Sequence, residues 1–206
     1  MTKTKQSLLE EWQITEEELD EVLREHKSMQ GYVIGYMAEY KLRKLLATDG
    51  RIKYIGKSDD HDRKDKSDLI IEYKEQRFTI EVKSLQAAKT RDLGDGKWKG
   101  RFQCDASDNR VVTFEDGSTL KTTCLLTGQF DILAACIFQF RKKWEFGFAK
   151  NVDLRRSPHK KYTDYQRKFL LVTEMAITLP LTPPYREDLV SLCDEIIAAR
   201  ASSHLP

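Results

Sequence analysis

The stretch that decides the fold is K-S-D-L-I-I-E-Y-K-E-Q-R-F-T-I-E-V-K-S-L-Q, residues 66–86. Apolar and polar residues alternate on both sides of K-E at 74–75, which predicts two antiparallel strands joined by a two-residue turn. With the turn at that point, Tyr73 lies opposite Gln76, and Asp68 lies opposite Glu81. One face of this hairpin is then apolar and is expected in the core. Its residues are Leu69, Ile71, Phe78, Ile80 and Val82.

The opposite face of the predicted hairpin carries Asp68, Glu81 and Lys83. Two carboxylates on adjacent strands repel each other unless a positive charge lies between them. Lys83 supplies part of that charge, and a hard divalent ion supplies it better, because Mg²⁺ prefers carboxylate oxygens. The alternative is an exposed sheet face on which Asp68 or Glu81 forms a cross-strand salt bridge with Lys83.

Two helices are predicted before the hairpin. Thr15 is an N-cap for a first helix with acids in its first turn and with Leu19, Val22 and Leu23 on one face. Gly31 is expected to separate it from a second helix, Tyr32 to Leu46. The apolar stripe of that helix consists of Ile34, Ala38, Leu42, Leu45 and Leu46.

Strands dominate the rest of the chain. Short strands are predicted at 51–55, 130–138 and 144–149, and a small hairpin is predicted to turn at Asp116-Gly117. Residues 85–110 are expected to be irregular, and a last helix is expected at 186–201. The sum predicts an α/β or α+β fold with a mixed central sheet flanked by helices. Residues 1–30 form an N-terminal helical extension, and residues 31–206 form a single domain.

Composition bounds the class of protein. With 206 residues, 40% hydrophobic and 33% charged, the chain is expected to be soluble and globular. Its longest apolar run is too short to span a membrane, and there is no leader, so a cytoplasmic protein without a membrane partner is expected. The four cysteines and four histidines are scattered. That spacing argues against a zinc site or a disulfide framework and favours reduced, buried thiols.

Charge is distributed unevenly along the chain. Residues 10–25 hold eight acids against Arg24 alone, whereas residues 141–168 hold ten bases against three acids. The basic region permits a surface that binds a polyanion, and the alternative is a charge-rich surface that is only solvated. The acidic first helix is expected to face away from it, in a protein contact or a dimer.

The pattern S-D-x12-E-V-K at 67–83, preceded by the helix G-Y-V-I-G-Y-M-A-E-Y-K-L at 31–42, resembles the PD-(D/E)XK nuclease superfamily. Asp68 matches the aspartate of the motif, Glu81 its second acid and Lys83 its lysine, and the helix supplies Glu39. Ser67 stands where the motif often has proline. Segments after the hairpin look like those of bacterial restriction-endonuclease-like proteins, and the resemblance covers roughly residues 31–150.

The resemblance implies a restriction-endonuclease-like core and Mg²⁺-dependent hydrolysis of DNA, with Mn²⁺ able to substitute and with a restriction-type or other defence role. Asp68, Glu81 and the Val82 carbonyl would bind the metal. Lys83 would orient or deprotonate the attacking water. Glu39 would bind a water of the outer shell or a second metal, and Gln86 would contact the phosphate or hold the site.

Residues 97–110 mix bases, amides and acids, as base-edge readers do. The candidates are Arg101, Gln103, Asp105, Ser107, Asp108, Asn109 and Arg110. The alternative is an ordered loop with Asx turns and surface salt bridges. A second set would follow phosphates. It consists of Arg155, Arg156, His159, Lys160 and Lys161. Trp98 and Trp144 are expected to pack rather than stack on bases.

Cleavage of both strands of double-stranded DNA needs two active sites, so a homodimer or a larger complex is expected. Two other functions stay open at this point. One is a nuclease of the same fold that acts on RNA or on a repair intermediate. The other is a catalytically silent module that binds DNA or takes part in assembly.

Overall fold

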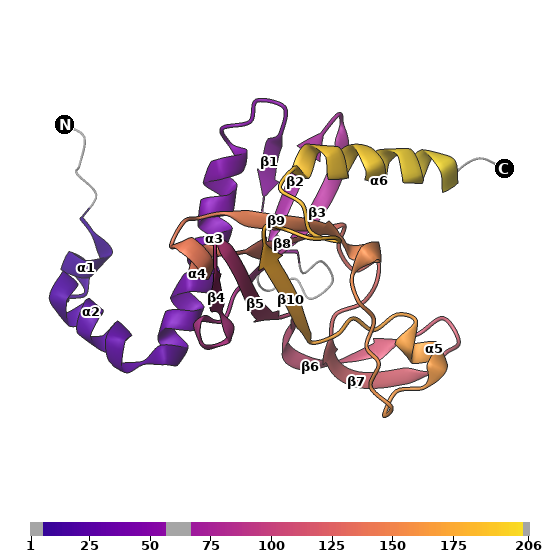
Figure 1. The fold of residues 1–206 in the computed structure, drawn as a ribbon, viewed down its shortest axis with the longest axis horizontal. Coiled ribbons are helices and arrows are strands. Elements are labelled where there is room, and N and C mark those ends of the chain that lie inside the picture. Colours follow the sequence, from indigo (N-terminus) through magenta and orange to yellow (C-terminus); the bar gives the residue numbers. More distant parts are fainter. Residues whose placement is uncertain (1–5, 57–66, 204–206) are drawn as a thin grey trace. The chain divides into compact units, whose positions relative to one another are not determined.

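The computed structural model describes residues 6–56 and 67–203. The chain divides into two compact units, residues 1–37 and residues 38–206. Figure 1 shows the order of the elements. In the part of the chain that the structure describes, no helix has the length and apolar character needed to cross a membrane.

The first unit contains α1 (Leu8–Glu11), α2 (Glu16–Glu25) and the start of α3 (Lys27–Leu46). Thr15 caps α2 as predicted: its side chain accepts the Glu18 N–H, and the Glu18 carboxylate accepts the Thr15 N–H. The predicted break at Gly31 is wrong, because α3 runs through it and the chain departs from helix at His26. A single glycine lowers helix propensity by only about 1 kcal/mol, which its helix-forming neighbours offset.

The C-terminal part of α3 belongs to the second unit and buries Ala38, Leu42 and Leu46. These three residues are spaced by four and therefore lie on one line along the helix. Leu45 falls beside that line and is 48% exposed, so its predicted place in the stripe is wrong.

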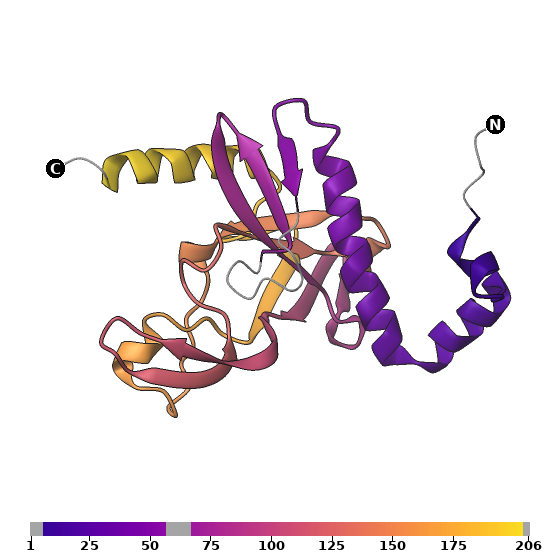
Figure 2. The ribbon, with the colours of Figure 1, turned by 180° about the vertical axis from the view of Figure 1, so that it is seen from behind.

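The second unit is built on a mixed sheet in the strand order β1-β2-β3-β8-β9. The strands are β1 (Lys53–Gly56), β2 (Leu69–Tyr73), β3 (Gln76–Ser84), β8 (Ile132–Cys136) and β9 (Phe146–Lys150). β3 and β8 are parallel, and the other pairs are antiparallel. Helices flank this sheet (Figures 1 and 2), so the predicted mixed α+β fold is confirmed.

The predicted hairpin register is confirmed. Tyr73 pairs with Gln76 and Leu69 pairs with Ile80. Lys74 and Glu75 take φ of 48° and 59°, the left-handed values that a type I′ turn requires at both positions. All five residues of the predicted apolar face are buried.

The two faces of the sheet are covered by different elements. The apolar face of the hairpin packs in one core with α3 and with α6 (Leu189–Ser203). The other face packs in a second core with β5 (Lys97–Gln103) and β10 (Glu174–Leu179). These two strands form a sheet with β4 (Arg91–Gly94). The charged side of the hairpin is therefore turned toward a covered face rather than toward open solvent.

The prediction that residues 85–110 are irregular is wrong. They form η1 (Ala87–Lys89), β4, β5 and the first part of β6 (Asp105–Thr113). In β5 the charged residues alternate with Trp98, Gly100 and Phe102. Gly100 interrupts the alternation of apolar and charged residues, so the sequence pattern does not indicate a strand. A Cβ added at Gly100 would lie 2.8 Å from Phe140 Cε1 and 2.9 Å from Leu85 Cδ2. Close packing selects glycine there, whereas sequence alone reads it as a loop signal.

The remaining predictions fall near the observed elements. The hairpin of β6 and β7 (Thr119–Cys124) turns at Asp116-Gly117, with Gly117 at φ 79°. Between β8 and β9 lies a one-turn helix, α4 (Phe138–Arg141), and α6 begins at Leu189. No element was predicted for η2 (Asn151–Asp153), α5 (Asp164–Arg167) or β10.

Two further predictions concern buried side chains. The four cysteines are free and buried, as expected. Trp98 stacks on Phe140 with ring centroids 5.9 Å apart, and Trp144 stacks on Phe138 at 4.3 Å. Both tryptophans therefore serve packing, as predicted.

Candidate active site

Asp68, Glu81 and Lys83 meet where β2 begins and β3 ends. Asp68 directly precedes β2, and its Oδ2 accepts the Val82 N–H at 2.7 Å. Glu81 and Lys83 follow each other on one face of β3, and Lys83 Nζ lies 2.6 Å from Glu81 Oε1. The β2–β3 register brings the aspartate to the strand that carries the other two.

The charged pair is shielded from water. The Glu81 side chain is 9% exposed and the Lys83 side chain 21%. The Glu81–Lys83 pair differs from the exposed cross-strand salt bridge of the alternative, because it lies along one strand and is covered. Burying two charges costs several kcal/mol per ion before their attraction is counted, so such a pair is weak evidence of a structural role. Charged groups held in this way are candidates for function.

The charge state of Lys83 follows from its neighbours. Burial acts to lower the pKa of Lys83, but the Glu81 and Asp68 carboxylates outweigh it and raise that pKa above its ordinary value. Lys83 is therefore an ammonium ion in this arrangement. A lysine that acts as a general base needs the opposite shift.

The donor set at this point fits a hard cation. Asp68 and Glu81 offer carboxylate oxygens, and Mg²⁺ is commonly bound by one or two carboxylates, with water and phosphate completing its shell. The N–H and C=O groups of one residue in an extended strand leave on the same side. The Val82 carbonyl therefore faces the Asp68 side, as its N–H does. Over residues 6–56 and 67–203, no group of three or more His, Cys, Asp or Glu side chains is arranged to hold a metal ion.

Glu39 and Gln86 lie on either side of this cluster in the sequence. Glu39 is half-buried in α3 next to Ala38 of the core, and its approach to Asp68 and Glu81 stays a prediction. Gln86 follows β3: its N–H donates to the Arg101 carbonyl at 3.1 Å, and its Nε2 donates to Gln103 Oε1 at 3.0 Å. These contacts tie the end of β3 to β5, and the two roles predicted for Gln86, contacting the phosphate or holding the site, stay predictions.

Asp105 and Arg110 of β6 interact electrostatically with the charged cluster. Burial raises the pKa of Asp105, and the Lys83 ammonium opposes that rise. Burial likewise lowers the pKa of Arg110, and the Glu81 carboxylate opposes that fall. Part of the segment predicted to read bases thus interacts electrostatically with the candidate active site.

The other predicted DNA-binding residues separate into two groups. Arg101 is paired with Glu174 at 2.9 Å. Arg156 donates to the backbone carbonyls of Val152, Leu154 and Lys168, so its guanidinium holds the local fold. The second group is exposed and consists of Ser107, Asp108, Asn109, Arg155, Lys160 and Lys161.

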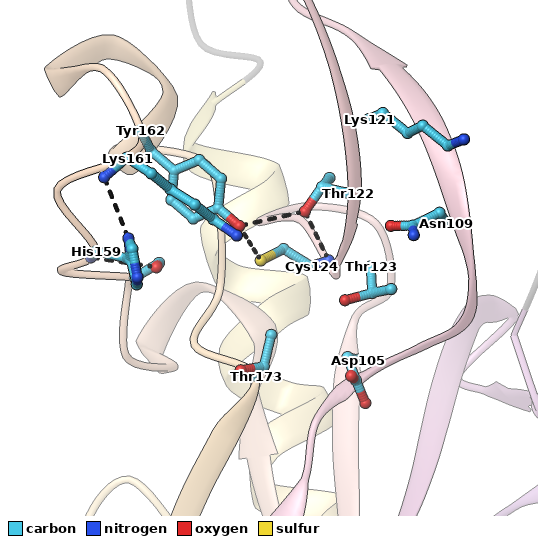
Figure 3. A pocket seen from close by; sticks show the side chains of 11 residues that line it. Asp105, Asn109, Lys121, Thr122, Thr123, Cys124, His159, Lys161, Tyr162 and Thr173 are labelled. Carbon is cyan, nitrogen blue, oxygen red and sulfur yellow. Dashed lines mark hydrogen bonds between the residues drawn. The ribbon is translucent and has the colours of Figure 1, made fainter.

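A pocket of about 290 Å³ opens between the β6–β7 hairpin and residues 157–162 (Figure 3). Its lining is almost entirely polar and carries more basic than acidic side chains. It consists of Asp105, Asn109, Lys121, Thr122, Thr123, Cys124, Ser157, His159, Lys161, Tyr162 and Thr173.

No protein-family model matches this chain, and no curated protein matches it. Among solved structures, a bacterial homing endonuclease matches with 14% identity and a TM-score of 0.41. The match covers 82% of this chain and 94% of that one. A TM-score below 0.5 supports no conclusion about activity, and a shared fold does not by itself imply a shared function.

Sequence reasoning missed the electrostatic interaction of Asp105 with Lys83, as well as the place of Lys121 and Tyr162 in the pocket. No spacing signal marks these residues. Lys121 and Tyr162 are brought together because β7 lies against residues 157–162, and only the folded chain shows this proximity.

Proposed function

We propose that the chain is a Mg²⁺-dependent endonuclease that hydrolyses phosphodiester bonds of DNA. The observation that carries the proposal is the Glu81–Lys83 pair, covered on the sheet face away from the hairpin's core and joined by Asp68 on the Val82 amide. A charged cluster in that position is costly to bury and contributes nothing to the apolar cores on either side.

The roles follow from the donor atoms. Asp68, Glu81 and the Val82 carbonyl would hold Mg²⁺, for which Mn²⁺ would substitute. When bound, such an ion lowers the pKa of a coordinated water and stabilises the charge that grows on the scissile phosphate. Glu39 would hold an outer-shell water or a second ion.

Lys83 acts in this proposal as a cation. Because Glu81 and Asp68 keep it protonated, it can bind a phosphate oxygen and orient the attacking water without first losing a proton. Gln86 supports the site through Gln103, which also lies next to Asp105. The exposed residues Arg155 and Lys160 would contact the DNA backbone, where each cation adds salt-dependent affinity.

Double-strand cleavage requires two such sites, so the working form would be a homodimer or a larger complex. A restriction-type or other defence role in the cytoplasm fits an enzyme that cuts duplex DNA. The proposed assembly and the proposed defence role both depend on the proposed DNA cleavage.

The test is incubation of the full chain with supercoiled plasmid in Mg²⁺, in Mn²⁺ and in EDTA. Discrete products with either metal, absent in EDTA and absent for Lys83→Ala and Asp68→Asn, would support site-specific cleavage. A smear with the same dependence would support a nonspecific nuclease. Lys143→Ala removes an exposed lysine from the turn between α4 and β9 and serves as the charge-matched control.

The same assay separates the rival functions. Cleavage confined to single-stranded RNA or to a branched duplex would support the other nuclease function, which acts on RNA or on a repair intermediate. Binding without cleavage under any metal would favour the silent module and would sink the enzyme proposal for this chain alone.

A further inference from the structure

The pocket beside β6 and β7 exists because the two strands do not pair regularly. Asp105 pairs with Cys124, but the next pair joins Arg110 to Thr122, so residues 106–109 bulge out of the ladder. Bulges occur often next to functional sites because they re-aim side chains. Here the bulge opens the hairpin between Asp105 and Asn109, both of which line the pocket.

The floor of the pocket holds a tyrosine hydroxyl with weak internal contacts. Tyr162 is buried, and its hydroxyl lies 3.5 Å from Thr122 Oγ1 and 3.4 Å from Cys124 Sγ. The first distance is long for a hydrogen bond between two oxygens, and a thiol sulfur is only a weak hydrogen-bond partner. The Tyr162 O–H is therefore able to donate to a group that enters the pocket.

Lys161 supplies a positive charge above this floor. Its Nζ lies 4.8 Å from the centre of the Tyr162 ring, and Figure 3 shows its side chain passing across that ring. Within residues 6–56 and 67–203, neither Lys161 nor Lys121 takes part in an ion pair, whereas Arg101, Lys150 and Arg186 all do. Among these described residues, no ion pair neutralises either lysine, and Asp105 is the one carboxylate in the pocket lining.

His159 adds a donor at the rim. Its Nδ1 accepts the Lys161 N–H at 3.1 Å, which leaves the proton of the neutral ring on Nε2. With the Asn109 amide and the hydroxyls of Thr122 and Thr123, the rim and floor present donors to an acceptor-rich ligand.

We propose that this pocket binds a phosphate group of a nucleic-acid strand. Lys161 and Lys121 supply the charge, and Tyr162, His159 and Asn109 supply hydrogen-bond donors. Asp105, one of the residues predicted to read bases, also lines the pocket. The inference rests on the proposed function in taking the bound strand to be the substrate.

The experiment measures binding without cleavage. The full chain is titrated in EDTA into a fluorescein-labelled DNA duplex, and anisotropy gives the dissociation constant at several salt concentrations. Loss of one phosphate contact in Lys161→Ala should reduce the salt slope by about one and weaken binding roughly five- to tenfold near 0.1 M salt. Tyr162→Phe, which removes only the hydroxyl, should weaken binding about threefold.

Lys143→Ala is the matched control, because it removes an exposed lysine that does not line the pocket. It should change affinity by less than about twofold. Equal weakening by Lys143→Ala and Lys161→Ala, or no weakening by Lys161→Ala, would overturn the inference. Lys161 is exposed, so its substitution leaves the fold intact, which circular dichroism checks.

A direct readout comes from the His159 ring resonances, assigned with His159→Asn. These should shift when the unlabelled duplex or inorganic phosphate is added, and an unmoved His159 signal on a saturated protein would contradict the proposal. A stronger shift with single-stranded RNA would still support phosphate binding in the pocket, and it would identify RNA rather than DNA as the bound strand. The experiments distinguish failure of the two proposals. If the protein binds duplex through Lys161 but never cleaves it, only the proposed hydrolysis is rejected. If Lys161→Ala binds and cleaves DNA as well as the parent chain, only the proposed pocket is rejected.

Discussion

The charged side chain of Lys83 is largely shielded from water. It is stabilised there by Glu81 at 2.6 Å, and the two residues depend on each other. An apolar pair of similar volume would serve the fold at least as well. If the pair serves catalysis rather than folding, replacing one residue and then both should have different effects on stability and on activity.

Lys83→Met should leave the Glu81 carboxylate buried without its partner and destabilise the protein by about 3 kcal/mol. The double variant Glu81→Gln/Lys83→Met removes both charges and should recover most of that loss. Urea unfolding followed by tryptophan fluorescence measures the difference. Plasmid cleavage should be absent in both variants, and a double variant that still cuts would show that the pair is structural.

At the scale of single elements, the β2–β3 hairpin sets the site by its turn. Lys74 and Glu75 are non-glycine residues held at positive φ, and this turn fixes the register that places Asp68 beside the end of β3. Because of this register, Asp68 lies near Glu81 and Lys83 although 12 residues separate Asp68 from Glu81 in the sequence. Two substitutions test the local geometry of such elements.

Glu75→Gly places a residue without steric penalty at φ 59°. Because glycine suits both central positions of a type I′ turn, we expect stabilisation by about 0.5–1 kcal/mol. Gln76→Gly, one position later in β3, is the control and should destabilise. Thermal unfolding by circular dichroism distinguishes the two, and destabilisation by both would mean that the turn is not type I′.

Gly100→Ala tests the contact between β5 and the central sheet. The new Cβ would meet Phe140 and Leu85 at under 3 Å, so the variant should lose about 1–3 kcal/mol of stability through overpacking. Gly56→Ala in β1 meets nothing within 4 Å and should be neutral or slightly stabilising. Equal urea midpoints for the two variants would contradict the close packing of β5.

At the scale of the whole molecule, the two cores on either face of the mixed sheet bury Cys104, Cys136 and Cys193. Burial raises the pKa of Cys104 and Cys193 to about 12 and that of Cys136 to about 11, from an ordinary value of 9.0. The folded chain therefore keeps these protons at pH values where the unfolded chain has lost them.

Because the unfolded state then binds fewer protons, the free energy of unfolding should fall as pH rises from about 9 toward 11, by about 1 kcal/mol for each thiol at pH 10. Urea unfolding at pH 8, 9 and 10 measures the fall. Cys136→Ala should show a shallower decline than the parent chain. At pH 8 Cys104, Cys136 and Cys193 of the native protein should not react with a thiol reagent, and rapid labelling of any of the three would show that it is accessible.

The sequence by itself determined the local features of this protein. Alternation around 74–75 predicted the hairpin, its register and its buried face, and Thr15 predicted a helix start, because these depend on neighbours a few residues away. The same reasoning failed for β5, where glycine reflects contact with Phe140, and for Gly31, where local propensity was too weak to break a helix. Only the tertiary structure decided that the Glu81–Lys83 pair is covered and that Lys121 and Tyr162 share a pocket. These facts depend on contacts between distant segments, and no local pattern of residue types encodes such contacts.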